Sequence, residues 1–140
     1  GVPASVEFLG FVDGINNLET AWAICAGAAR SEGTVTPDVW HMFRGGTKPE
    51  TLDSIPADHI SCFHWNDAPP EPPRAQQTDA DRVHCGDGIM DLKMIADQLR
   101  NKQWSGCLSL ELFNPTYWKQ DPMEVAKTGL AKMKQSVGQA

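Results

Sequence analysis

The sequence predicts an α/β domain in which four strand–helix units follow one another and all strands run parallel. Short apolar stretches typical of strands alternate with longer stretches of helical periodicity along the 140 residues. The apolar content of 41% is that of a globular protein, and the length suffices for one domain, expected at residues 1–140. Each strand-like stretch carries one acidic or histidine residue near its C-terminal end, where parallel sheets build functional sites.

The first unit begins almost at the start of the chain. Residues 4–11, ASVEFLGF, are expected to form a strand that ends in a glycine-containing turn. Residues 17–30 are expected to form a helix that Asn16 or Asn17 caps. The alanine-rich stripe of this helix suits close packing on a sheet.

The second and third units are less regular. Residues 34–40, TVTPDVW, are expected to form a strand, although Pro37 is a poor fit for a central ladder. Residues 48–54 are expected to form at most a short helix, and residues 58–66, DHISCFHWN, a third strand. The polar stretch 67–88 is expected to be a long loop, and loops of this length inside a compact domain are often functional.

The last part of the chain has the clearest periodicity. Residues 90–102 are expected to form an amphipathic helix, and residues 106–112, GCLSLEL, the fourth strand. A final helix is expected at 122–137, with Asp121 as its cap and Pro122 in its first turn.

Charge and hydropathy count against two classes of partner. The formal net charge is −6 and lysines and arginines do not cluster, whereas a nucleic-acid surface shows a basic stripe. No apolar run reaches the roughly 18–20 residues that span a membrane, and no basic-then-apolar signal segment opens the chain. We therefore expect neither a nucleic-acid nor a membrane partner.

Four cysteines lie far apart in the chain, at positions 25, 62, 85 and 107. They form no C-x-x-C pair, which counts against a zinc ribbon. We expect reduced thiols, as in a cytoplasmic protein.

Two glutamates stand inside apolar strand-like stretches. Glu7 lies in SVEFLGF, residues 5–11, and Glu111 in the similar CLSLELF, residues 107–113. An unpaired buried carboxylate costs several kcal/mol or takes up a proton. Both glutamates therefore require a cation nearby, either an arginine or a metal ion.

Asp38 and His64 occupy matching positions near the ends of the second and third predicted strands. Each also has a simpler interpretation, Asp38 as a turn residue and His64 as a core histidine hydrogen-bonded to backbone. Together with Glu7 and Glu111 they supply three carboxylates and one imidazole, a donor set that suits Mn²⁺, Co²⁺, Mg²⁺ or Zn²⁺.

This donor set suggests a class of chemistry. A divalent ion can hold the adjacent carbonyl and hydroxyl oxygens of a sugar and stabilise an enediolate. Glu7 and Glu111 stand on the first and last strands, so they could face each other and take and return a proton as an acid–base pair.

Five motifs together resemble the sugar phosphate isomerase/epimerase family of xylose isomerase-like TIM barrels. They are VEFLGF, PDVWHMFRGG, HISCFHWNDAP, DRVHCGDGIMDL and LSLELFNPTYW, and they run from the first residues to the last helix, so the resemblance covers the whole chain. The resemblance implies a metal-dependent isomerase or epimerase for a small sugar, polyol or keto-acid. It implies that the metal ligands are Glu7, Asp38, His64 and Glu111, with Glu7 and Glu111 also catalytic.

The same resemblance implies substrate-binding roles for His41, in the Asp-x-x-His pattern, and for Arg82, in the Asp-Arg pair before Gly-x-Gly. The simpler interpretations are a surface histidine and a loop salt bridge. Related DNA-repair endonucleases carry an Asp-x-His pattern in the long loop, but here the triplet is Asp81-Arg82-Val83. This difference and the acidic charge count against a DNA substrate.

The length departs most from the family, because a TIM barrel has eight units in about 250 residues. The four units predicted here match the C-terminal half, so the fold expected is half of such a barrel. Its open edges and uncovered inner face would be closed by a two-fold dimer or by a missing N-terminal half. Two alternatives stay open: a dehydratase (lyase) on the same scaffold, and a catalytically inactive half-barrel that self-associates.

Overall fold

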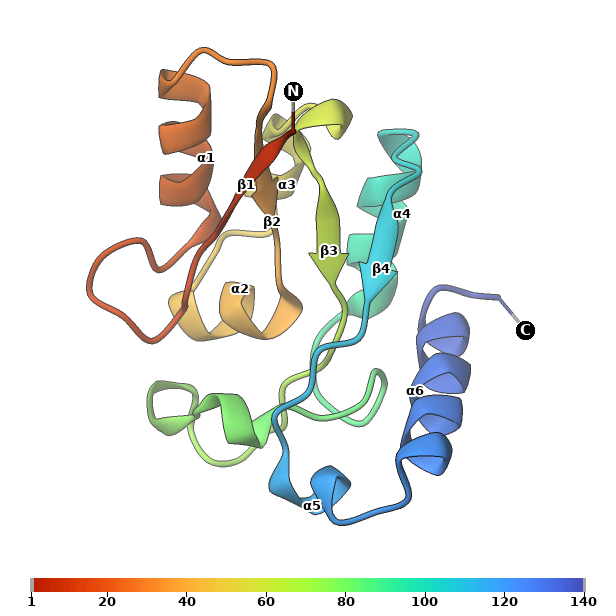
Figure 1. Cartoon of the computed structure of the whole chain (residues 1–140). Helices are drawn as coiled ribbons and strands as arrows, with labels where there is room; N and C mark the ends of the chain where they lie inside the picture. Colours follow the sequence, from red (N-terminus) through yellow and green to blue (C-terminus); the bar gives the residue numbers. More distant parts are fainter. Residues whose placement is uncertain (1, 140) are drawn as a thin grey trace.

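The computed structural model describes residues 2–139 and has four parallel strands in chain order (Figure 1). They are β1 (Ala4–Glu7), β2 (Gly33–Thr36), β3 (Cys62–His64) and β4 (Cys107–Ser109). Strand β1 pairs with β2 and β3 with β4, and single parallel bridges, Val35 to Ile60 and Asp38 to His64, connect the two pairs. The predicted parallel order is therefore present, with strands shorter than expected.

Six α-helices follow or separate the strands in the described part of the chain. They are α1 (Leu18–Gly27), α2 (Val39–Gly45), α3 (Thr51–Ser54), α4 (Leu92–Asn101), α5 (Pro115–Trp118) and α6 (Pro122–Ser136). The side chains of Asn17, Asp91 and Asp121 cap α1, α4 and α6 by accepting backbone N–H groups, which confirms the three long helices predicted. Within residues 2–139, no helix combines the length and the apolar character that crossing a membrane requires.

The prediction of a strand through residues 34–40 is wrong at its end. Strand β2 stops before Pro37, whose carbonyl still accepts a hydrogen bond from the backbone N–H of His64 at 2.8 Å. Asp38 then caps α2, because its Oδ1 accepts from the backbone N–H of His41 at 2.7 Å. The ladder ends where proline cannot donate, and the aspartate starts a helix there.

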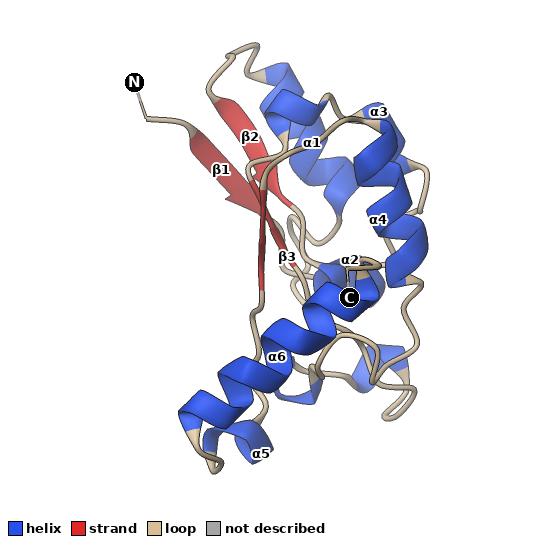
Figure 2. Cartoon of the chain, turned by 90° about the vertical axis from the view of Figure 1, so that its right-hand side faces the viewer, coloured by secondary structure: helices blue, strands red, loops and turns tan. Residues whose placement is uncertain are grey.

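Helices α1, α3 and α4 lie on one side of the strands, and the other side is uncovered (Figure 2). The strand residues Val6, Val35, Phe63 and Leu108 pack into the apolar core on the helix side. Because strand side chains alternate, the intervening residues point the other way. We call that uncovered side the open face.

The predicted loop 67–88 is ordered around Asp67, which is 1% exposed. Its carboxylate accepts backbone N–H groups from Ala68, Gly86 and Met90 at 2.8 to 3.0 Å. Short 3₁₀ turns, Arg74–Gln76 and Asp79–Asp81, lie inside the loop. The second of them delivers Arg82 to the ends of the strands.

Candidate metal centre

Four residues meet at the C-terminal ends of the strands, one from each strand–helix unit. One ligand atom of each of Glu7, Asp38, His64 and Glu111 lies within 4.8 Å of all the others. The His64 Nδ1 atom is 2.8 Å from Glu7 Oε1, 3.3 Å from Glu111 Oε2 and 3.6 Å from Asp38 Oδ2. The structure therefore brings together all four residues that the sequence suggested as ligands.

The charges in this cluster shift the pKa values of its members. Hydrogen bonds with Asp38, Glu111 and Glu7 raise the pKa of His64 to about 12, although burial of the ring acts to lower it. Burial would raise the pKa of Asp38, but the hydrogen bond from His64 and the charge of Arg82 hold it below its ordinary value. The hydrogen bond from His64 likewise lowers the pKa of Glu111. Without a metal ion, an imidazolium thus supplies positive charge among three carboxylates.

The cluster fits a divalent cation by its donor chemistry. Three carboxylates converge on one imidazole nitrogen, and oxygen and imidazole donors together suit Mn²⁺, Co²⁺, Mg²⁺ and Zn²⁺. An ion bound to Nδ1 of His64 would take the place of the proton on that nitrogen. The four residues are therefore the ones that would hold such an ion.

Arg82 contacts two of these residues, Asp38 and Glu111, and is only 1% exposed. Its Nη1 donates to Asp38 Oδ2 and to Glu111 Oε2, both at 2.8 Å. The guanidinium also lies over the rings of Trp40 and Phe113, 5.1 and 5.2 Å from their centroids. The loop salt bridge considered from the sequence is thus a buried one, and it joins the loop to two ligands of the candidate centre.

His41 is buried beside Arg82, 2% exposed, and is not the surface histidine of the simpler interpretation. Its Nδ1 accepts a hydrogen bond from the backbone N–H of Gly10 at 3.1 Å, and its Nε2 lies 2.9 Å from Arg82 Nη2. Burial lowers the pKa of His41, so the ring is neutral at neutral pH. It packs against the arginine as an uncharged ring.

Asn66 belongs to the site, although no role was expected for it from the sequence. It is fully buried, and its Nδ2 donates to Asp38 Oδ2 at 3.0 Å while its Oδ1 accepts from the backbone N–H of Trp40 at 2.9 Å. The available signal was its place two residues after His64, on the same face of the chain. Asn66 and Arg82 together fix the Asp38 carboxylate.

Comparisons with known proteins agree with this architecture. A family model described as xylose isomerase-like TIM barrel matches residues 1–136. The chain is 30% identical over 129 residues to inosose isomerases of Halalkalibacterium halodurans and Bacillus subtilis, covering 91% of this chain and 45% and 46% of those proteins. It thus spans about half the length of these curated relatives.

Solved structures give the same picture. A crystal structure of IolI protein with a binding zinc atom superposes with a TM-score of 0.92 at 29% identity, covering 98% of this chain and 49% of that one. A structure of L-ribulose 3-epimerase shares the fold at 19% identity, with a TM-score of 0.75 and 48% of its length covered. The resemblance seen in the sequence is confirmed: the chain belongs to the xylose isomerase-like TIM barrel family and has the architecture of half such a barrel.

Proposed function

We propose that this chain carries the metal centre of a divalent-metal-dependent isomerase or epimerase acting on a small sugar, polyol or keto-acid. The observation that carries the proposal is the convergence of Glu7, Asp38, His64 and Glu111 within 4.8 Å at the strand ends. Relatives named inosose isomerase and a related structure with a zinc atom support it.

The three carboxylates divide into two kinds by exposure. The side chains of Glu7 and Glu111 are 33% and 32% exposed, whereas that of Asp38 is fully buried. A bound ion would polarise a carbonyl oxygen of the substrate and make the neighbouring C–H group more acidic. The two accessible glutamates can then take that proton and return it, while Asp38 stays fixed.

The lowered pKa of Glu111 keeps it ionised at neutral pH, as a base requires. We assign His41 and Arg82 to positioning: Arg82 holds Asp38 and Glu111, and His41 packs behind Arg82. The direct substrate contacts predicted for His41 and Arg82 stay predictions, since both side chains are almost completely buried.

A dehydratase would use the same first proton transfer, so the products decide between the two activities. With the barrel completed and Mn²⁺ supplied, we expect an inosose-type ketone in D₂O to gain deuterium at its α-carbon without losing water. Glu111→Gln should abolish the exchange. NMR spectra that show elimination of water would identify a lyase, and the absence of both reactions would favour the inactive half-barrel.

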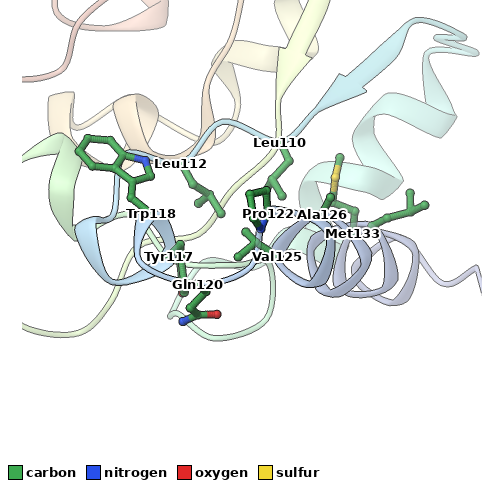
Figure 3. Close-up of a pocket in the computed structure, with 10 residues that line it drawn as sticks. Leu110, Leu112, Tyr117, Trp118, Gln120, Pro122, Val125, Ala126 and Met133 are labelled. Atoms are coloured by element: carbon green, nitrogen blue, oxygen red, sulfur yellow. The ribbon is translucent and has the colours of Figure 1, made fainter.

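The activity requires closure of the barrel, and apolar grooves lie at both edges of the sheet. One, of about 580 Å³, lies between the chain after β4 and α6, where Leu110, Leu112 and Trp118 line it (Figure 3). Leu130 lines it as well. The other, of about 470 Å³, is lined by residues of β1 and α1. Unpaired edges with apolar grooves suit further strand–helix units on each side.

The open face indicates which kind of half would fit. Below the metal centre it presents small side chains, namely Ser5, Thr36, Ser61, Cys62, Cys107 and Ser109. Barrel interiors are normally filled by bulky branched residues. A second copy would leave the interior underpacked and bring two sets of three carboxylates together. We therefore propose closure by a non-identical half-barrel with bulky interior side chains.

A further inference from the structure

Two thiols lie side by side on the open face. Cys62 and Cys107 are the first residues of β3 and β4 and are direct partners in the parallel register. Their Sγ atoms are 3.5 Å apart, and both cysteines are free. In the isolated chain neither is buried, in contrast to Cys25 and Cys85, so an ion can reach this pair before the barrel is closed.

The separation of the two sulfur atoms suits a shared ion. Tetrahedral zinc binds thiolates at about 2.3 Å, which puts two sulfurs on one ion roughly 3.8 Å apart. A disulfide bond is about 2.05 Å long, so the two sulfur atoms would have to move much closer together to form one. The observed 3.5 Å is close to the distance in such a chelate.

The pair is separate from the carboxylate–histidine centre. Cys62 precedes His64 by two residues on the same strand, a Cα separation of about 7 Å at the usual strand rise. Cys107 precedes Glu111 by four residues, which is farther still. The donor atoms that lie within 4.8 Å of one another around His64 include neither sulfur, and the donor chemistry differs, since thiolates select soft cations and carboxylates hard ones.

We propose that Cys62 and Cys107 form a second cation site, which takes a thiophilic divalent ion of the Cd²⁺ or Zn²⁺ class. Each thiol loses its proton as it binds, so two thiols and one ion give one dithiolate chelate and two released protons. Water or a small thiol fills the other positions of the ion. The bound ion joins β3 to β4, the strands that lead to His64 and Glu111.

The test compares a soft ion with a hard one on the purified chain. In equilibrium dialysis we expect two Cd²⁺ but one Mn²⁺ per chain, together with the ultraviolet absorption of a thiolate–cadmium bond. The double variant Cys62→Ser/Cys107→Ser should lose that absorption and one Cd²⁺ and keep its Mn²⁺. Cys25→Ala, at a buried cysteine, is the matched control and should keep both.

The outcome is independent of the isomerase proposal, because Glu111→Gln should lose Mn²⁺ and keep the cadmium–thiolate absorption. Each single variant, Cys62→Ser and Cys107→Ser, should weaken Cd²⁺ binding at the thiol site while circular dichroism shows an unchanged fold. Absorption that is absent from the wild-type chain, or that persists in the folded double variant, would overturn the proposal.

Discussion

The Nδ1 atom of His64 lies 2.8 Å from Oε1 of Glu7, although 57 positions separate the two residues in the chain. His64 ends β3 and Glu7 ends β1, with β2 between them in the order of the strands. The parallel arrangement alone brings these side chains to one edge. Because the two atoms are so close, the positive charge of His64 stabilises the carboxylates of the metal-free site.

Metal affinity should therefore increase with pH. His64, whose pKa is about 12 without metal, must lose its proton before Nδ1 can bind an ion. Each bound ion should release about one proton from this residue, and apparent affinity should rise about tenfold per pH unit between about pH 6 and 8. Mn²⁺ titrations across this range measure the slope. His64→Gln should bind weakly with no such slope, and an equal slope in this variant would contradict the assignment.

The stability of the metal-free chain should change in the opposite direction. A pKa raised from an ordinary 6.5 to about 12 stabilises the fold fully below pH 6.5, and this contribution declines as pH rises toward 12. The free energy of unfolding from urea titrations should therefore fall between about pH 7 and 9. His64→Gln should lose much of this dependence. A wild-type stability that rises with pH over this range would show that His64 is not protonated.

Removal of Arg82 should destabilise the fold, because the fully buried Asp38 would lose its arginine partner. We expect Arg82→Met to cost about 3–5 kcal/mol of unfolding free energy in urea, as when a buried ion pair is broken. Arg30→Met is the matched control. Arg30 is exposed, and its Nε atom lies 3.8 Å from Oε2 of Glu32. Loss of this exposed ion pair should cost less than about 1 kcal/mol of unfolding free energy.

Adding Mn²⁺ distinguishes an electrostatic role of Arg82 from a role in packing alone. The ion would restore positive charge beside Asp38 and Glu111, so it should recover part of the stability lost in Arg82→Met. Equal destabilisation with and without Mn²⁺ would argue that Arg82 acts through packing alone.

The groove of about 580 Å³ between the chain after β4 and α6 provides a test of barrel closure. The chain should form a one-to-one complex when it is co-expressed with the half of Bacillus subtilis inosose isomerase that it does not cover. Leu130→Glu, at a groove residue that is 55% exposed, should prevent the complex and leave the isolated chain folded. Light scattering of the chain alone decides the alternative, because a stable dimer that Leu130→Glu dissociates would favour closure by a second copy.

The convergence of Glu7, Asp38, His64 and Glu111 could be predicted from the sequence, because each lies near the end of a predicted strand. The apolar neighbours of Glu7 and Glu111 in the sequence indicated buried carboxylates, but that expectation was wrong, since their side chains are 33% and 32% exposed and Glu111 lies two residues beyond β4. The helix caps at Asn17 and Asp121 could also be predicted, because each precedes a stretch of helical periodicity.

The residues that support the ligands could not be predicted from local patterns. Arg82 comes from a loop without periodicity, and its bond to Asp38 crosses 44 positions of the chain. Helix α2 was missed because the β-branched residues before Pro37 favour a strand. The helix depends on the cap that Asp38 gives to the backbone N–H of His41, a contact that competes with strand continuation.

Mn²⁺ binding to the metal-stripped chain tests the central claim most directly. Equilibrium dialysis should find one Mn²⁺ per chain, with an affinity that falls more than about 100-fold in Glu111→Gln, beyond the usual effect of residues behind a ligand. Glu124→Gln removes an exposed carboxylate of α6 and should bind as the wild type does. A wild-type chain that binds no Mn²⁺, or a Glu111→Gln variant that binds it equally well, would contradict the assignment of the metal centre.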